Sequence, residues 1–67
     1  MHNELGTTAG DIYQKLNAQG QMSMSRLKKE IARNDVMVTM AVGWLAREGK
    51  VSLSKERHAL KIALNGH

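Results

Sequence analysis

The chain has 67 residues, enough for one small domain, and ten Lys and Arg residues against six Asp and Glu give it a net charge of +4. It contains no cysteine, which excludes disulfides, thiolate metal sites and cysteine nucleophiles. No apolar run is long enough to span a membrane, and the start of the chain is too polar for a secretory signal, so we expect a cytoplasmic protein without a membrane partner.

The first predicted element is a helix over residues 9–18. Apolar side chains recur there with the spacing of one helix face, at Ala9, Ile12, Tyr13 and Leu16. Thr8 is a candidate N-cap, because Asp11 three residues later completes a T-x-x-D capping box, and Gly20 supplies a stop signal. Leu5, ahead of this cap, either folds back onto the helix or belongs to a frayed tail.

A second predicted helix covers residues 24–33, with Ser23 as its N-cap. Residues 21–23 are too few to predict a strand from their own pattern. Four cations lie on this helix, away from its apolar side: Arg26, Lys28, Lys29 and Arg33. They form either a solvated helix face or a surface for phosphate groups.

The third predicted helix lies within residues 34–50, and Asn34 is its N-cap. Its apolar face consists of Val38, Ala41, Val42 and Leu45, and Gly49 ends it. Only a short link separates this helix from the second one. Two helices joined so closely must cross at a steep angle, which is the geometry of a helix-turn-helix.

After Gly49 the hydrophobic period changes from that of a helix to that of a strand, which predicts two β-strands. Their alternating apolar residues are Val51 and Leu53 in the first strand, and Leu60, Ile62 and Leu64 in the second. The segment between them, Lys55–His58, has neither Gly nor Pro. We therefore expect a loop of about four or five residues instead of a two-residue primed turn. Residues 65–67 are expected to form a frayed end.

Together these elements predict an α+β, mainly helical fold: a winged helix-turn-helix with three helices and a small antiparallel β-wing. In that fold, residues 21–23 occupy the position of a short edge strand. We expect a single domain over residues 1–67, with an ordered core at about 5–64.

Three motifs give a resemblance to a known family. They are Ala9-Gly10-Asp11-Ile12-Tyr13 with Leu16, Asn17 and Gly20, then Leu27-Lys28-Lys29, and, most specific of the three, the run AVGWLAREGKV at residues 41–51. On these motifs the chain resembles a family of small stand-alone bacterial winged helix-turn-helix proteins, most of them of unknown function. The resemblance covers about residues 5–64 and implies the fold, but it implies no particular ligand.

The outer face of the third helix bears on DNA binding. Helical spacing places Val36, Thr39, Gly43 and Arg47 opposite the apolar stripe. Base reading in the major groove needs donors and acceptors that this face largely lacks, so we expect contacts mainly to phosphates. The predicted DNA-binding residues are Arg26, Lys28, Lys29, Thr39, Arg47, Lys55, Arg57 and Lys61. The first functional hypothesis is therefore a transcription-associated protein that binds double-stranded DNA as a homodimer.

A second apolar stripe on the third helix consists of Met37, Met40 and Trp44. Trp44 either folds against the wing or the first helix and completes a small core, or forms with the methionines an exposed patch for a homodimer or a protein partner. The alternative function is therefore a protein-interaction or dimerisation module that does not bind DNA.

No constellation of catalytic or cofactor-binding residues is visible. His2, His58 and His67 lack the spacing of metal ligands, and there is no carboxylate pair, activated nucleophile or Gly-rich phosphate loop. We therefore expect no enzyme, no cofactor and no bound metal. Gly43, inside a helix, is expected where a neighbouring chain or another helix packs closely.

Overall fold

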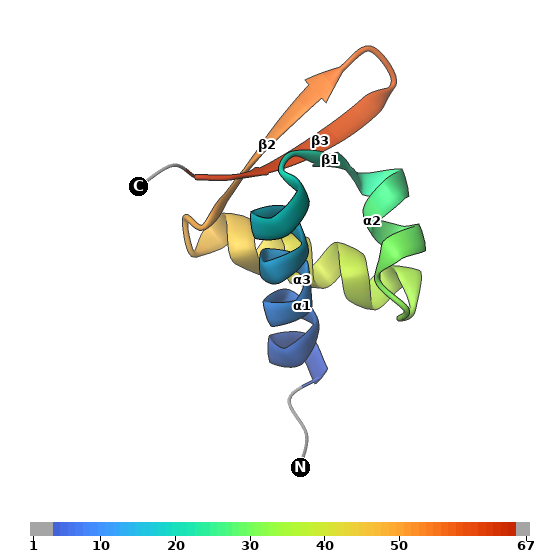
Figure 1. Ribbon diagram of the computed structural model, residues 1–67, viewed down its shortest axis with the longest axis vertical. Helices are drawn as coiled ribbons and strands as arrows, with labels where there is room; N and C mark the ends of the chain where they lie inside the picture. Colours follow the sequence, from blue (N-terminus) through green and yellow to red (C-terminus); the bar gives the residue numbers. More distant parts are fainter. Residues whose placement is uncertain (1–3, 66–67) are drawn as a thin grey trace.

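The computed structural model describes residues 4–65 as three helices and a three-stranded antiparallel sheet (Figure 1). In chain order the elements are α1 (Glu4–Gln19), β1 (Met22–Ser23), α2 (Met24–Glu30), α3 (Asp35–Arg47), β2 (Val51–Glu56) and β3 (Ala59–Leu64). Strand β3 lies between its hairpin partner β2 and the short strand β1, and the β2–β3 hairpin is the wing. This architecture confirms the predicted α+β winged helix-turn-helix fold.

The helices and the sheet enclose one common core. Fully buried side chains come from four different elements: Ile12, Leu27, Val38 and Ile62. The apolar face predicted for α3 is buried along its whole length. Burial of each large aliphatic side chain contributes about 1.5–3 kcal/mol, so this core supplies the stability that a chain without disulfides needs. In Figure 1 the sheet lies above the helices, and the wing extends beyond them.

Helix α1 begins at Glu4, more than one turn before the predicted start. Thr8 therefore lies inside the helix, where it is fully buried, and the predicted capping box is wrong. Leu5 packs against the core, and this tertiary contact explains why the helix extends past a local capping signal. The predicted stop is confirmed, because Gly20 has a φ of 83° and donates its N–H to the Leu16 carbonyl oxygen (2.7 Å).

Both predicted N-caps of the helix-turn-helix are confirmed. The Ser23 hydroxyl accepts a hydrogen bond from the N–H of Arg26 (3.1 Å) at the start of α2. The Asn34 side-chain oxygen accepts from the N–H groups of Val36 (2.7 Å) and Met37 (3.3 Å) at the start of α3. These bonds satisfy helix N–H groups that have no partner within the helix itself.

Helix α2 is shorter than predicted and ends at Glu30 instead of Arg33. Ile31 leaves the helix with φ −93° and ψ 114° and is only 5% exposed, because the extended backbone carries its side chain into the core. Arg33 then lies in the link to α3, where its guanidinium donates to the Asp11 carboxylate of α1 (3.2 Å). The link is therefore fixed to the core on one side and to α1 on the other.

The turn of the wing differs from the prediction. Glu56 pairs directly with Ala59, so only Arg57 and His58 connect the two strands, and the predicted loop of four or five residues is wrong. Arg57 has a φ of 57°, the positive φ that primed two-residue turns require at their first central position. The paired strands hold this conformation although it costs a non-glycine residue roughly 1–2 kcal/mol.

The end of β3 is tied to the turn that follows α3. The backbone N–H of Asn65 donates to the Lys50 carbonyl oxygen (3.0 Å). Its side-chain amide donates to the Gly49 carbonyl oxygen and accepts from the Ser52 hydroxyl. The predicted fraying is therefore wrong for Asn65, while residues 66 and 67 lie outside the described residues.

Candidate nucleic-acid interface

The outward side of α3 is a continuous exposed surface, which we call the α3 face. It consists of Val36, Thr39, Met40, Gly43 and Arg47, all exposed and all spaced along one side of the helix. Val36 is 66% and Met40 53% exposed, values high for large apolar side chains. The Thr39 hydroxyl donates to the Asp35 carbonyl oxygen (2.9 Å), so its hydrogen is already engaged. From residue 36 to 46 the α3 face therefore offers mainly methyl and methylene groups.

The start of α3 is not an open phosphate site. Helix N-termini bind phosphates through N–H groups that lack a partner. Here the Asn34 side chain already accepts from two of those N–H groups, and Asp35 places a carboxylate in the first turn. Phosphate contacts near this helix must therefore come from side chains of other residues.

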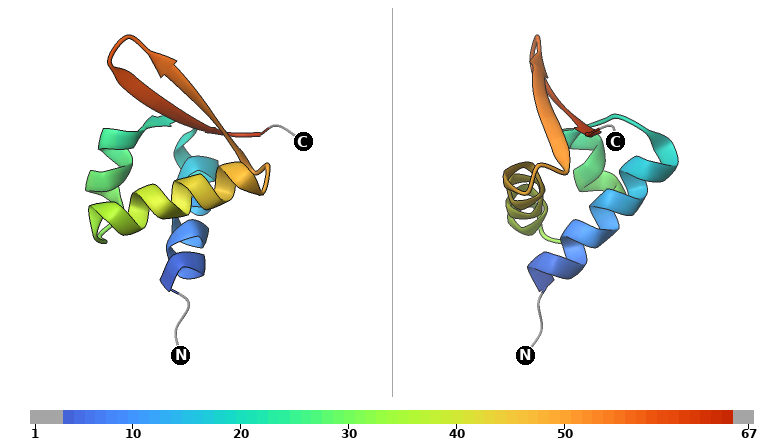
Figure 2. Two further views of the ribbon diagram at one scale, coloured as in Figure 1. Left: turned by 180° about the vertical axis from the view of Figure 1, so that it is seen from behind. Right: turned by 90° about the vertical axis from the view of Figure 1, so that its left-hand side faces the viewer.

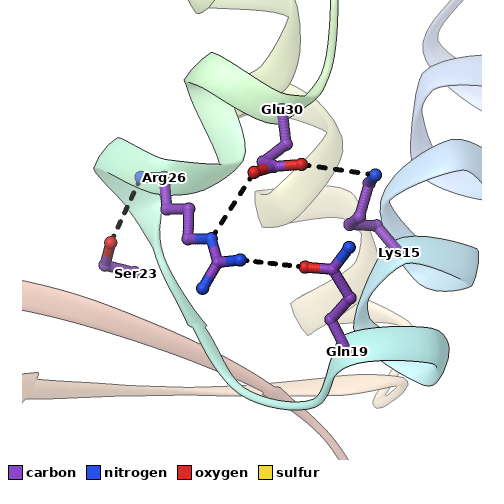
Figure 3. Close-up of polar contacts among 5 residues, drawn as sticks. All are labelled: Lys15, Gln19, Ser23, Arg26 and Glu30. Atoms are coloured by element: carbon purple, nitrogen blue, oxygen red, sulfur yellow. Dashed lines mark hydrogen bonds and ion pairs between the residues drawn. The ribbon is translucent and has the colours of Figure 1, made fainter.

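Three cations are paired with carboxylates on the α1 side of the molecule. Lys15 lies 3.4 Å and Arg26 lies 3.5 Å from the Glu30 carboxylate, and the Arg26 guanidinium also donates to the Gln19 side-chain oxygen (3.1 Å) (Figure 3). The third pair joins Arg33 to α1, as described above. Arg26, which we predicted to contact DNA, thus links α2 to the end of α1, and its DNA contact stays a prediction.

The other seven cations take no part in the ion pairs formed within residues 4–65. They are Lys28, Lys29, Arg47, Lys50, Lys55, Arg57 and Lys61. Lys28 and Lys29 occupy the last turn of α2, next to the link that leads into α3, and Arg47 occupies the last turn of α3. Cations therefore flank both ends of α3, whose 13 residues span about 20 Å.

The α3 helix and the wing lie on the same side of the molecule. In the right-hand view of Figure 2, α3 is seen end-on with the wing rising above it, whereas α1 runs away on the other side. The elements α3 and the wing therefore lie on one side of the fold, and they carry the predicted DNA-binding residues Thr39, Arg47, Lys55, Arg57 and Lys61. Duplex DNA docked there would lie away from α1.

Two of the predicted DNA-binding residues of the wing, Lys55 and Lys61, lie on opposite faces of the hairpin. Lys55 pairs with Leu60 and Lys61 pairs with Ser54, so the two lysines occupy neighbouring registers. Neighbouring registers face opposite sides of a sheet. The wing therefore presents Lys55 on one side, Lys61 on the other and Arg57 at its tip.

The apolar stripe predicted on α3 is divided by the fold. Met40 is on the exposed α3 face, whereas Met37 and Trp44 are half-buried, and Trp44 packs against the core. Beside Trp44 is a hollow of about 400 Å³ between α1 and the end of α3. Its lining includes Gly6, Ala9, Gly10 and Tyr13 of α1, together with Trp44, Glu48 and Lys50. The interface role of Met37, Met40 and Trp44 stays a prediction.

Gly43 is not a site of close helix packing within the chain. A Cβ atom built on it would meet nothing within 4 Å, so the expectation that another helix of this chain approaches it is wrong. An exposed glycine in a helix costs about 1 kcal/mol relative to alanine. Its open surroundings leave the middle of the α3 face free for a close approach from outside.

Residues 4–65 contain neither a cluster of metal ligands nor a membrane-spanning helix. No group of three or more His, Cys, Asp and Glu side chains is placed to hold a metal ion there. In the same part of the chain, no helix combines the length and apolar character needed to cross a bilayer.

Comparison with known proteins identifies a family and a relative of this chain. The family model described as "Winged helix-turn-helix domain (DUF2582)" matches residues 1–64. An uncharacterized protein of Methanocaldococcus jannaschii is 41% identical over 59 residues, which cover 84% of this chain and 83% of that protein. This relative is archaeal, whereas the sequence motifs suggested a bacterial family.

Proposed function

We propose that this chain, which belongs to the winged helix-turn-helix domain family (DUF2582), binds double-stranded DNA and contacts mainly its phosphates. The observation that carries the proposal is the separation of cations into paired and unpaired sets. The acidic partners Asp11 and Glu30 hold Lys15, Arg26 and Arg33 near α1. The cations that form no ion pair within residues 4–65 lie around α3 and on the wing, where a helix of this fold would meet a duplex.

The proposed contact set consists of Lys28, Lys29, Arg47, Lys55 and Arg57. Lys28 and Lys29 belong to the last turn of α2, just before the link into α3. Arg47 belongs to the last turn of α3, and Lys55 and Arg57 belong to the outer half of the wing. Cations so distributed would neutralise phosphates on both sides of a groove and release their counterions. The transcription-associated role and the cytoplasmic location belong to the same proposal and rest on the DNA binding.

The test is the salt dependence of binding to a mixed-sequence duplex of about 20 base pairs, followed by fluorescence anisotropy at about 50 and 200 mM salt. Three or more phosphate contacts predict that the affinity falls tens-fold or more between these conditions, because each contact contributes about 0.9 to the slope of log K against log salt. Absence of binding at the lower salt concentration would contradict the proposal.

A matched pair of double variants locates the contacts. Lys28→Gln with Lys29→Gln should lower the salt slope by about 2, because it removes two phosphate contacts. Lys15→Gln with Arg33→Gln removes the same charge from residues that are paired to carboxylates on the α1 side, and should leave the slope unchanged. If both double variants lower the slope of log K against log salt equally, the binding depends only on the net charge of the protein, and the proposed surface is wrong.

A second candidate function, docking of a second copy or a protein partner, is favoured by the hollow beside Trp44. We expect a homodimer that uses the half-buried Trp44 and the exposed ring of Tyr13, which is 42% exposed. Analytical ultracentrifugation at high micromolar concentration should show a dimer, and Tyr13→Asp should shift it toward monomer. Lys15→Asp, on the same helix outside the hollow, is the control. A wild-type monomer under these conditions would exclude the dimer.

A further inference from the structure

We infer that the α3 face recognises the methyl groups of thymine in the major groove, so that the protein prefers duplexes rich in these methyl groups. This inference rests on the DNA binding proposed above and assigns a role to the apolar residues that phosphate contacts leave unused.

The chemistry of the α3 face excludes the usual hydrogen-bonded readout. Guanine is read by Arg or Lys, and adenine by Asn or Gln, through pairs of hydrogen bonds. Such side chains are absent from the α3 face until Arg47 in the last turn, and the Asn34 side chain is engaged in its cap. The Thr39 hydroxyl is bonded to the Asp35 carbonyl oxygen, which leaves its methyl group as the part available to a ligand.

Methyl groups are what this surface can contact. The thymine methyl is the apolar feature of the major groove, and small or aliphatic side chains recognise it by contact. Val36 and Met40 expose more than half of their surface, one turn apart, and would each lose water on meeting such a methyl group. Gly43 follows one turn later with open space where its side chain would be, so the helix can approach the groove closely.

Charge complementarity identifies DNA as the occupant of the α3 face. A protein interface also has an apolar core and a polar rim, so the sign of the charges around the patch distinguishes the two occupants. Here Lys28 and Lys29 lie beyond one end of the patch and Arg47 lies at the other. The apolar residues from Val36 to Gly43 span about 10 Å. Asp35 and Glu48 reduce the charge at the two ends, but Lys28 with Lys29 and Arg47 with Lys50 leave each end net positive. This arrangement matches a groove whose floor carries methyl groups and whose edges are phosphates.

The test compares two mixed-sequence duplexes that differ only by replacement of every dT with dU. Uracil lacks the 5-methyl group but keeps every phosphate and hydrogen-bonding group, and a sequence without A-tracts avoids differences in groove shape. At low salt the dU duplex should bind about fivefold or more weakly, as expected when a few buried methyl contacts are lost. Replacing cytosine with 5-methylcytosine in the same duplex should strengthen binding.

A double variant assigns this preference to the α3 face. Val36→Ala with Met40→Ala keeps the helix, because both side chains are exposed and alanine favours helix. The variant should lose most of its preference for the dT duplex, keeping at most the contribution of the Thr39 methyl group, while its salt slope stays that of the wild type. Lys15→Gln, far from this face, should retain the preference.

The outcomes separate this inference from the proposed function. Equal wild-type affinity for the two duplexes overturns the methyl recognition and leaves phosphate binding in place. A preference that persists unchanged in the Val36→Ala, Met40→Ala variant overturns it as well, because another surface then reads the methyl groups. No binding of either duplex at low salt overturns both proposals.

Discussion

Thr8 shows how a residue with a helix-capping sequence can have a different role in the fold. It is completely buried inside α1, and among the described residues its hydroxyl oxygen has no hydrogen-bond partner. A buried polar group without a partner costs about 1–3 kcal/mol. We conclude that this hydroxyl lowers the stability of the domain.

Thr8→Val should therefore raise the free energy of unfolding by about 1 kcal/mol, because it replaces the hydroxyl with a methyl group of similar size. Urea denaturation followed by circular dichroism measures this difference. Thr39→Val is the control, since its hydroxyl is exposed and already bonded to the Asp35 carbonyl oxygen. A Thr8→Val protein no more stable than the wild type would contradict the account.

At the residue scale, the sequence identified the cations but not the partners that other elements supply to them. Arg26 has the same local context as Lys28 and Lys29, yet it reaches Glu30 in α2 and Gln19 in α1. The pair with Glu30 lies within α2 at i, i+4 and follows from helical spacing. The bond to Gln19 depends on how two helices meet, which helical spacing does not specify. The exposed methyl groups of Val36 and Met40 follow from spacing alone, because the buried stripe of α3 was predicted correctly.

At the scale of elements, local chemistry predicted where the two helices of the helix-turn-helix begin. Contacts between residues distant in the sequence determined the start of α1 and the end of β3. Ser23 and Asn34 cap their helices because a side-chain oxygen meets nearby backbone N–H groups. The early start of α1 depends instead on the packing of Leu5 against the core. Likewise, the bonds of Asn65 join residues that are distant in the sequence.

The wing turn is the clearest case in which strand pairing prevails over residue preference. Its residues lack the glycine that a primed turn favours, and the pairing of Glu56 with Ala59 still closes a two-residue turn. The turn length also fixes the register, and through it the opposite orientations of Lys55 and Lys61. A wrong prediction of the turn length therefore prevents any prediction of which wing cations lie on the same face of the sheet.

Arg57→Gly should raise the free energy of unfolding by about 1 kcal/mol, because glycine adopts a positive φ without the steric cost that arginine bears. For a domain of this size that difference raises Tm by about 4–8 °C, which thermal unfolding measures. His58→Gly is the matched control: His58 has no positive φ, so glycine there should lower the stability. A lower Tm for Arg57→Gly would show that the turn carries no such strain.

At the scale of the whole molecule, the two sides of the fold differ in character. One side has α1, its ion pairs and the hollow beside Trp44, which suit contact with another protein. The other side has the α3 face, its flanking cations and the wing, which suit a duplex. The two surfaces meet at the end of α3, because Trp44 and Glu48 line the hollow and Arg47 belongs to the α3 face.

The most direct test of the central claim, that DNA binds on the side of α3 and the wing, is a titration of the protein with duplex DNA followed by amide chemical shifts. We predict that the largest changes at low salt occur at residues 28–29, 36–47 and 55–57, and that residues 13–18 on α1 change little. Largest changes on α1 around Tyr13, or no changes at any ratio of duplex to protein, would contradict this account.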